Sequence, residues 1–208
     1  MFEVRIHGRG GQGVVTAAEM LSIAGFTEGL WAQAFPSFGS ERMGAPVTAF
    51  CRLDEREIRS REPVNTPDAL IIQDPTLLHQ VKVFDGLAKN GYVLINSKRS
   101  LAELGIAEFL AGLPAANVMA IPATELAIKH VGRPLPNAVL LAGFCAVTGR
   151  IRLASVEAAI RKKFPTAVAE RNIAAAREAF AMVSEARGGQ GTQQVTTAEG
   201  AKRHAEAV

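Results

Sequence analysis

The chain has 208 residues, of which 48% are hydrophobic and 21% charged, and its formal net charge is only +3. This composition excludes a largely disordered protein, and the scattered Lys and Arg residues form no basic stripe of the kind that binds nucleic acid. No apolar run reaches the roughly 20 residues of a bilayer crossing and no targeting peptide is apparent, so we expect a cytoplasmic protein with neither membrane nor nucleic acid as a partner.

The first predicted unit is a strand, a glycine-rich loop and a helix. Residues 2–7 alternate apolar and polar side chains, as a strand does, and residues 14–24 have a helical pattern. Between them, Gly8, Gly10 and Gly13 satisfy the pattern G-x-G-x-x-G. In this strand-to-helix context the pattern is typical of phosphate binding.

The physical basis is that successive glycines let backbone N–H groups approach a phosphate closely, while the positive end of the helix adds to the attraction. Arg9 offers a full positive charge. The alternative is that the glycines only permit a tight turn and close packing of strand on helix. A dinucleotide site also needs an acidic residue about 20 positions on, and residues 30–36 contain none, so NAD and FAD are disfavoured.

The next unusual segment, residues 35–46, has the sequence FPSFGSERMGAP. Its prolines and glycines predict a loop. Two phenylalanines and the pair Glu41 and Arg42 are unusual in a plain connector and indicate a recognition loop. The alternative is that the phenylalanines cap the core and the charged pair is solvated.

The rest of the chain predicts an α/β fold. Further strands are expected at residues 46–53, 69–73, 92–96 and 117–121. Helical patterns between several of them predict a Rossmann-like, mainly parallel sheet with helices on both faces. A C-terminal helical segment is expected after the last strand, with helices at residues 137–147, 153–163 and 166–186.

One domain is expected over residues 1–187. Residues 188–208 are rich in Gly, Gln, Thr and Ala and have no apolar face, which predicts a flexible C-terminal tail or a segment that orders only on a partner. Within the domain, Asp74 before Pro75 predicts a helix start, and Ser100 with Glu103 has capping-box spacing.

No catalytic or metal-binding residue is predicted. The 4 histidines lack metal-ligand spacing, and His7, next to the glycine loop, is expected near a ligand or in a structural hydrogen bond. Cys51 and Cys145 lie in apolar sequence, as buried thiols do, and a cluster needs about four thiolates. The chain alone is therefore expected to hold no cofactor, and clusters on another chain would carry any electrons.

Together, residues 6–18 (IHGRGGQGVVTAA) and 35–47 (FPSFGSERMGAPV) resemble the gamma subunit of pyruvate:ferredoxin oxidoreductase and related 2-oxoacid:acceptor oxidoreductases. The resemblance implies oxidative decarboxylation of a 2-oxo acid to an acyl-CoA in a hetero-oligomer, whose other subunits carry thiamine diphosphate and iron–sulfur clusters. It also implies that this chain is not catalytic alone, that it packs on the thiamine-binding subunits and that it helps to handle coenzyme A. Met43 stands where many relatives have a basic residue.

By that resemblance, the cofactor-binding candidates are the residues of the two loops: Gly8, Arg9, Gly10, Gly11, Gln12, Gly13, Ser37, Phe38, Gly39, Ser40, Glu41 and Arg42. Two other functions stay open, a free-standing Rossmann-type nucleotide-binding oxidoreductase and a purely structural assembly subunit. Pyruvate, 2-oxoglutarate, branched-chain and aryl 2-oxo acids are equally open as substrates, with ferredoxin or NAD as acceptor, because the reacting carbon would lie on another subunit.

Overall fold

The computed structural model describes residues 1–37, 43–60 and 62–205, with the backbone alone for residues 189–205. Its strands are β1 (Phe2–Arg9), β2 (Trp31–Pro36), β3 (Pro46–Asp54), β4 (Ala69–Ile72), β5 (Tyr92–Asn96) and β6 (Val118–Ile121). Its α-helices are α1 (Val14–Thr27), α2 (Ala107–Leu110), α3 (Ala123–Val131), α4 (Asn137–Thr148), α5 (Leu153–Lys163) and α6 (Thr166–Ala205). Two short 3-10 helices are η1 (Pro75–His79) and η2 (Ala115–Asn117).

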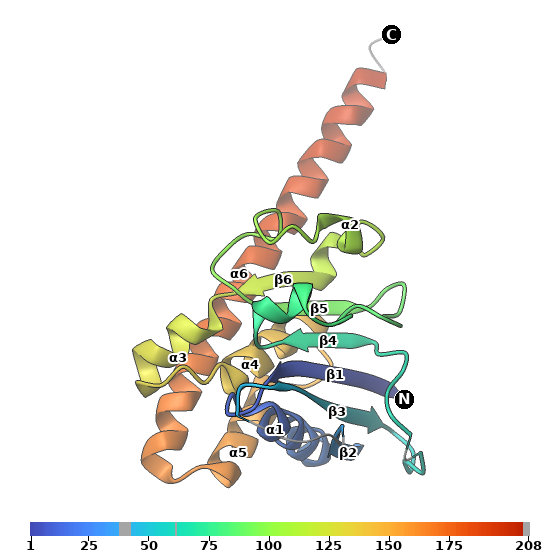
Figure 1. Ribbon diagram of the computed structural model, residues 1–208. Coiled ribbons are helices and arrows are strands. Elements are labelled where there is room, and N and C mark those ends of the chain that lie inside the picture. The colour runs from blue at the N-terminus through green and yellow to red at the C-terminus, as the bar shows by residue number, and fades with distance from the viewer. Residues whose placement is uncertain (38–42, 61, 206–208) are drawn as a thin grey trace.

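The strands form one 6-stranded sheet in the order β2-β3-β1-β4-β5-β6 (Figure 1). β1, β4, β5 and β6 run parallel, whereas β3 is antiparallel to both β1 and β2. The predicted α/β fold with a mainly parallel sheet is thus confirmed. Strand β2 was not among the expected strands, because its sequence WAQAFP contains two small alanines and a proline, which give little strand signal.

The long helices α1, α4, α5 and α6 pack together on one face of the sheet. Val4, Ile6, Ile71 and Leu94 point to this face and form one core with them. Helix α4 is buried along almost its whole length, which explains why it is apolar all round. The expected C-terminal helical segment therefore completes one face of the same domain.

The opposite face is covered by loops and short helical turns, among them η1 and α2. Leu70, Ile72 and Ile95 of the sheet form a second core there with Leu77 of η1. The helices that the sequence predicts on this face are present only as short ones. Of the two predicted helix starts, Asp74 caps η1, whereas the capping box at Ser100 closes only a turn.

Two buried arginines attach loops to the β1–β3 half of this second face. The guanidinium of Arg5 donates to the carbonyl oxygens of Val83 at 3.0 Å and Asp85 at 2.5 Å. That of Arg52 donates to the carbonyl oxygen of Glu62 at 2.5 Å and forms an ion pair with Glu3 at 2.7 Å. Hydrogen bonds from the two guanidinium groups to backbone carbonyl oxygens thus help to hold these loops in place.

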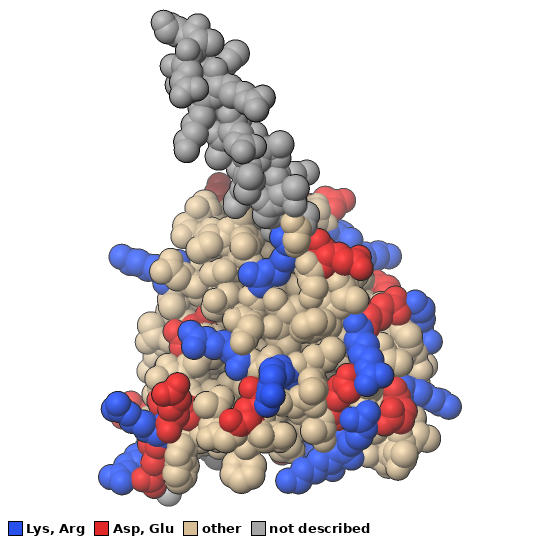
Figure 2. Space-filling model, turned by 180° about the vertical axis from the view of Figure 1, so that it is seen from behind, with Lys and Arg blue, Asp and Glu red and all other residues tan. Residues whose placement is uncertain are grey.

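Helix α6 continues past its expected end at Ala186 to Ala205. That the domain ends at residue 187 and is followed by a flexible tail stays a prediction. On the face seen in Figure 2, basic and acidic side chains are interspersed. No helix in the described part of the chain is both long and apolar enough to cross a membrane.

Candidate functional site

The glycine-rich loop lies at the carboxyl ends of the parallel strands. It follows β1 directly, and the neighbouring strands β4 and β5 end beside it at Ile72 and Asn96. Ligands of open α/β sheets bind at this edge. The loop between β2 and β3 starts and ends at the same edge, because Arg9 pairs with Pro46 and the N–H of Ser37 donates to the carbonyl oxygen of Thr48 at 2.8 Å.

Backbone hydrogen bonds join the two loops. The N–H of Gly10 donates to the carbonyl oxygen of Ala45 at 2.9 Å, and the N–H of Gly44 donates to that of Gly10 at 3.1 Å. The two segments that the sequence singled out therefore meet. Among the second-loop candidates, Ser37 is described, whereas Phe38, Gly39, Ser40, Glu41 and Arg42 lie outside the described residues.

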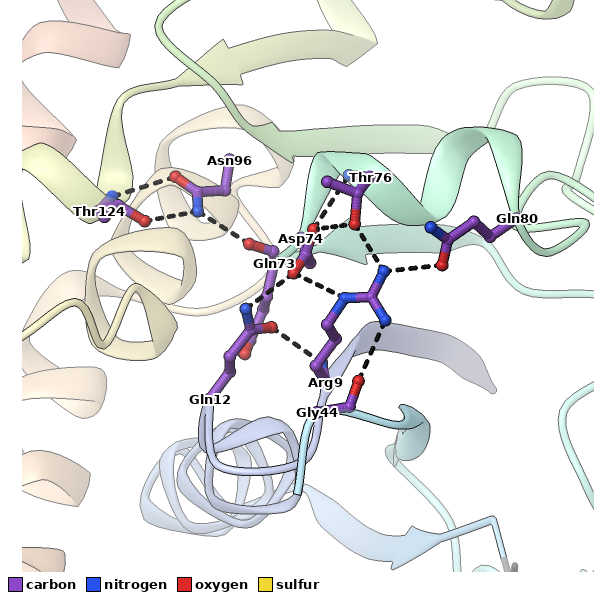
Figure 3. Close-up of polar contacts among 9 residues, drawn as sticks. All are labelled: Arg9, Gln12, Gly44, Gln73, Asp74, Thr76, Gln80, Asn96 and Thr124. Atoms are coloured by element: carbon purple, nitrogen blue, oxygen red, sulfur yellow. Dashed lines mark hydrogen bonds and ion pairs between the residues drawn. The ribbon is translucent and has the colours of Figure 1, made fainter. Parts of the chain in front are cut away.

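Arg9 connects both loops to the segment after β4 (Figure 3). Its Nε donates to Asp74 at 3.1 Å and its Nη1 to the carbonyl oxygen of Gly44 at 3.0 Å. Its Nη2 donates to the Thr76 hydroxyl and to the Gln80 side chain, both at 2.7 Å. The guanidinium is thus occupied by protein groups, and its charge is offset by Asp74.

Gln12 forms a second connection between the loop and Asp74. Its side-chain oxygen accepts from the N–H of Arg9 at 2.8 Å, and its Nε2 donates to Asp74 at 2.9 Å. Partial burial opposes ionisation of Asp74, but hydrogen bonds from Thr76 and Gln12 and the charge of Arg9 hold the pKa of its carboxyl below the ordinary value. Asp74 is therefore an ionised anchor for the loop at neutral pH.

Several backbone N–H groups of the glycine loop and of the first turn of α1 have no acceptor among the described residues. In the described part of the chain, no hydrogen bond is made by the N–H groups of Gly11, Gly13, Val14, Val15 and Thr16. They lie at the positive end of α1. The same residues line an open cavity of about 430 Å³, together with Arg9, Gly10, Met43 and Val47. This arrangement suits an anion such as a phosphate.

The glycines of the loop have different roles. Gly11 and Gly13 have φ angles of 93° and 73°, which only glycine adopts readily. A Cβ on Gly13 would also lie 2.6 Å from Nδ2 of Asn137, at the start of α4. Gly8 instead permits close packing, since a Cβ there would lie 2.6 Å from Val14. The packing interpretation of the motif therefore fits Gly8, whereas Gly11 and Gly13 shape the cavity.

Two buried amides at this edge were not singled out from the sequence. Asn96 donates to the carbonyl oxygen of Gln73 at 2.8 Å and to the Thr124 hydroxyl at 2.7 Å. Gln73 is 1% exposed, and its side-chain amide has no partner within the described residues. Their signal in the sequence is an amide residue at the end of an apolar strand, in ALIIQ and YVLIN.

His7 points away from the cavity, to the same side of β1 as Arg5. Its Nε2 accepts from Nε of Arg5 at 3.1 Å, and its Nδ1 lies 3.3 Å from the Thr48 hydroxyl. Burial, with the charge of Arg5 as a smaller cause, lowers the pKa of His7 to about 4. His7 is therefore a neutral histidine in a structural hydrogen bond, which is one of the two roles expected for it.

The cysteines are also structural. Cys51 and Cys145 are buried, and burial raises the pKa of both thiols, that of Cys145 to about 12. Among the residues that the structure describes, no group of three or more His, Cys, Asp or Glu side chains is placed to hold a metal ion.

Comparisons with known proteins agree with one another. The model of the family "Pyruvate ferredoxin/flavodoxin oxidoreductase" matches residues 3–182. The chain is 44% identical over 180 residues to the "Pyruvate/ketoisovalerate oxidoreductases common subunit gamma" of Pyrococcus abyssi, which covers 86% of this chain and 96% of the relative.

Two solved structures are similar in fold. The crystal structure of pyruvate oxidoreductase subunit PORC from Thermotoga maritima has a TM-score of 0.72 at 32% identity, over 86% of this chain and 94% of that one. A chain of 2-oxoglutarate:ferredoxin oxidoreductase from Magnetococcus marinus, solved with 2-oxoglutarate, coenzyme A and succinyl-CoA bound, has a TM-score of 0.71. At 18% identity, over 89% of this chain and 31% of that one, it shows likeness of fold alone.

Proposed function

Since the chain belongs to the pyruvate ferredoxin/flavodoxin oxidoreductase family, as a gamma-type subunit, we propose that its own part in the reaction is to hold phosphate groups of coenzyme A at the start of α1. The observation that carries this proposal is the set of N–H groups of Gly11 and of residues 13–16, which lie beside the cavity and have no acceptor among the described residues. Backbone donors at a helix N-terminus bind phosphate without any cationic side chain.

The candidate residues would act in two ways. Gly10, Gly11 and Gly13 would let the phosphate approach the backbone, and Val14 to Thr16 would offer the first N–H groups of the helix. Gly8, Gln12 and Arg9 would keep the loop in shape by packing and hydrogen bonding. Ser37 begins the second loop, whose residues 38–42 stay candidates for the ligand or for a subunit contact.

The remaining chemistry belongs to partner subunits in this proposal. They would hold the thiamine diphosphate, on which the 2-oxo acid is decarboxylated, and the iron–sulfur clusters that take its electrons. This chain would receive coenzyme A for the final acyl transfer, in a cytoplasmic complex. Two buried, separate cysteines support this division, because a cluster takes about four thiolates.

A Gly13→Ala substitution tests the proposal. The added methyl group would disturb the left-handed turn and lie 2.6 Å from the Asn137 side chain, so the first N–H groups of α1 would shift. We expect the KM for coenzyme A to rise about ten- to hundredfold, the effect of losing charge-assisted hydrogen bonds of about 1.5–3 kcal/mol. The KM for the 2-oxo acid should not change, because thiamine chemistry precedes the acyl transfer.

Gly29→Ala is the matched control. Gly29 has a similar φ of 83°, but a Cβ there would meet nothing within 4 Å, and it follows the other end of α1. It therefore reproduces the backbone strain far from the cavity. If Gly13→Ala assembles normally and has the same KM for coenzyme A as Gly29→Ala, the glycine loop is structural. The chain is then better described as a purely structural assembly subunit.

A further inference from the structure

An apolar groove runs across the face opposite the long helices. Two adjoining cavities of about 840 and 560 Å³ share Phe84 and Phe109. The apolar side chains along this Phe84 groove include Leu78, Val81, Phe84, Leu87, Phe109 and Leu113. Most of them are only partly buried and pack on the second core from outside. The groove is thus an open extension of the core.

The two phenylalanines make the groove a distinct surface feature. Their rings stack with centroids 5.3 Å apart and an interplanar angle of 15°. Phe109 nevertheless remains 64% exposed. Stacked aromatic side chains over a wide apolar groove are typical of a binding surface, because leaving them in water forgoes their burial energy.

The rim of the groove is positively charged. Lys82 and Lys89 line it and are exposed, and neither forms an ion pair with any residue that the structure describes. Asp85 is the acidic residue that lines the groove, and it lies near the buried Arg5. Burial lowers the pKa of Arg5, and the negative charge of Asp85 opposes that shift. The one carboxylate that lines the groove thus lies near a cation of the same chain, whereas Lys82 and Lys89 form no ion pair among the described residues.

The groove also adjoins the candidate site. Gln80 lines it and accepts the hydrogen bond from Nη2 of Arg9 at 2.7 Å. Arg9 in turn holds the glycine loop through Asp74 and Gly44. A molecule seated in the groove would contact the segment that supports the phosphate-binding loop.

We propose that the Phe84 groove docks a partner subunit of the same complex, through an amphipathic segment with an apolar ridge and an acidic flank. The ridge would cover Phe84 and Phe109, and the acidic side chains would face Lys82 and Lys89. The proposal rests on membership of a family with multisubunit relatives, and it does not depend on which residues bind coenzyme A.

Reconstitution of the complex from the full-length chain and its partner subunits tests this inference. We expect Phe109→Ser to raise the dissociation constant between this subunit and its partners at least tenfold. The double variant Lys82→Glu/Lys89→Glu should raise it by a similar factor, and its dissociation constant should change less with salt concentration than that of the parent. Phe26→Ser is the matched control, since Phe26 is also exposed (74%) but lies on α1, on the other face.

Normal assembly of folded Phe109→Ser and of the charge-reversal variant would overturn the inference. So would self-association of the isolated chain that Phe109→Ser abolishes, because the occupant would then be a second copy. At subunit concentrations that saturate assembly, the groove variants should keep the parental KM for coenzyme A. A failure of the docking inference can thus be told from a failure of the phosphate site, which Gly13→Ala tests in assembled complexes.

Discussion

Replacing Arg9 by methionine is expected to loosen both loops of the candidate site and to raise the KM for coenzyme A at least tenfold in the assembled complex. The substitution removes the hydrogen bonds to Asp74, Gly44, Thr76 and Gln80 while keeping most of the side-chain length. At about 0.5–1 kcal/mol for each of these four bonds, the lower half of the usual range because three of them are exposed, the free energy of unfolding should fall by about 2–4 kcal/mol. Denaturant unfolding and steady-state kinetics measure the two effects.

Arg9→Lys separates two roles for this residue. A lysine keeps the positive charge but has no planar fork to reach several acceptors. If Arg9 positions the loops, Arg9→Lys should resemble Arg9→Met in both measurements. If Arg9→Lys retains the parental coenzyme A dependence while Arg9→Met loses it, Arg9 instead acts as a charge on the phosphate, as its sequence position had indicated.

The largest loss of stability is expected from Arg52→Met. Arg52 is 2% exposed and donates to Glu3 and to the carbonyl oxygens of Ser60 and Glu62. Methionine would leave these acceptors without a donor in a buried place. Breaking such a buried pair costs about 3–5 kcal/mol, and denaturant unfolding should show a lower free energy of that order.

Arg59→Met is the control for this substitution. Arg59 lies in the loop to which Arg52 donates, is 85% exposed at its side chain and forms an ion pair with Glu57 at 2.8 Å. Exposed pairs contribute about 0–1 kcal/mol, so its loss should hardly change the unfolding free energy. Similar, small effects of Arg52→Met and Arg59→Met would show that Arg52 does not hold the loop.

The main elements of the fold could be predicted because their signals are local. Strand β5 and helix α5 have the expected bounds, since each is a periodic or apolar segment between clear turn residues. Strand β2 gave no such signal. The way in which loops attach to the second face of the sheet could not be predicted, because Arg5 donates hydrogen bonds to backbone carbonyls 59 to 80 positions away in the sequence.

The candidate site was predicted as a pair of loops but not in its internal roles. The glycine spacing indicates a phosphate loop, which stays a prediction, and the N–H groups of Gly11 and Gly13 have no acceptor among the described residues. That Arg9 binds the phosphate stays a prediction. The sequence does not show that its side chain donates to groups up to 71 positions away. The buried Gln73 was missed because a single amide after a strand is weak evidence by itself.

Hydrogen–deuterium exchange in the assembled complex measures directly whether the N–H groups at the start of α1 take the phosphates of coenzyme A. Saturating coenzyme A should slow exchange at Gly11 and at residues 13–16, whose N–H groups lack acceptors in the described structure, and should leave the other end of α1, near Gly29, unchanged. If coenzyme A saturates the complex without slowing exchange at Gly11 and at residues 13–16, the phosphates bind elsewhere and the proposed role of this loop is wrong.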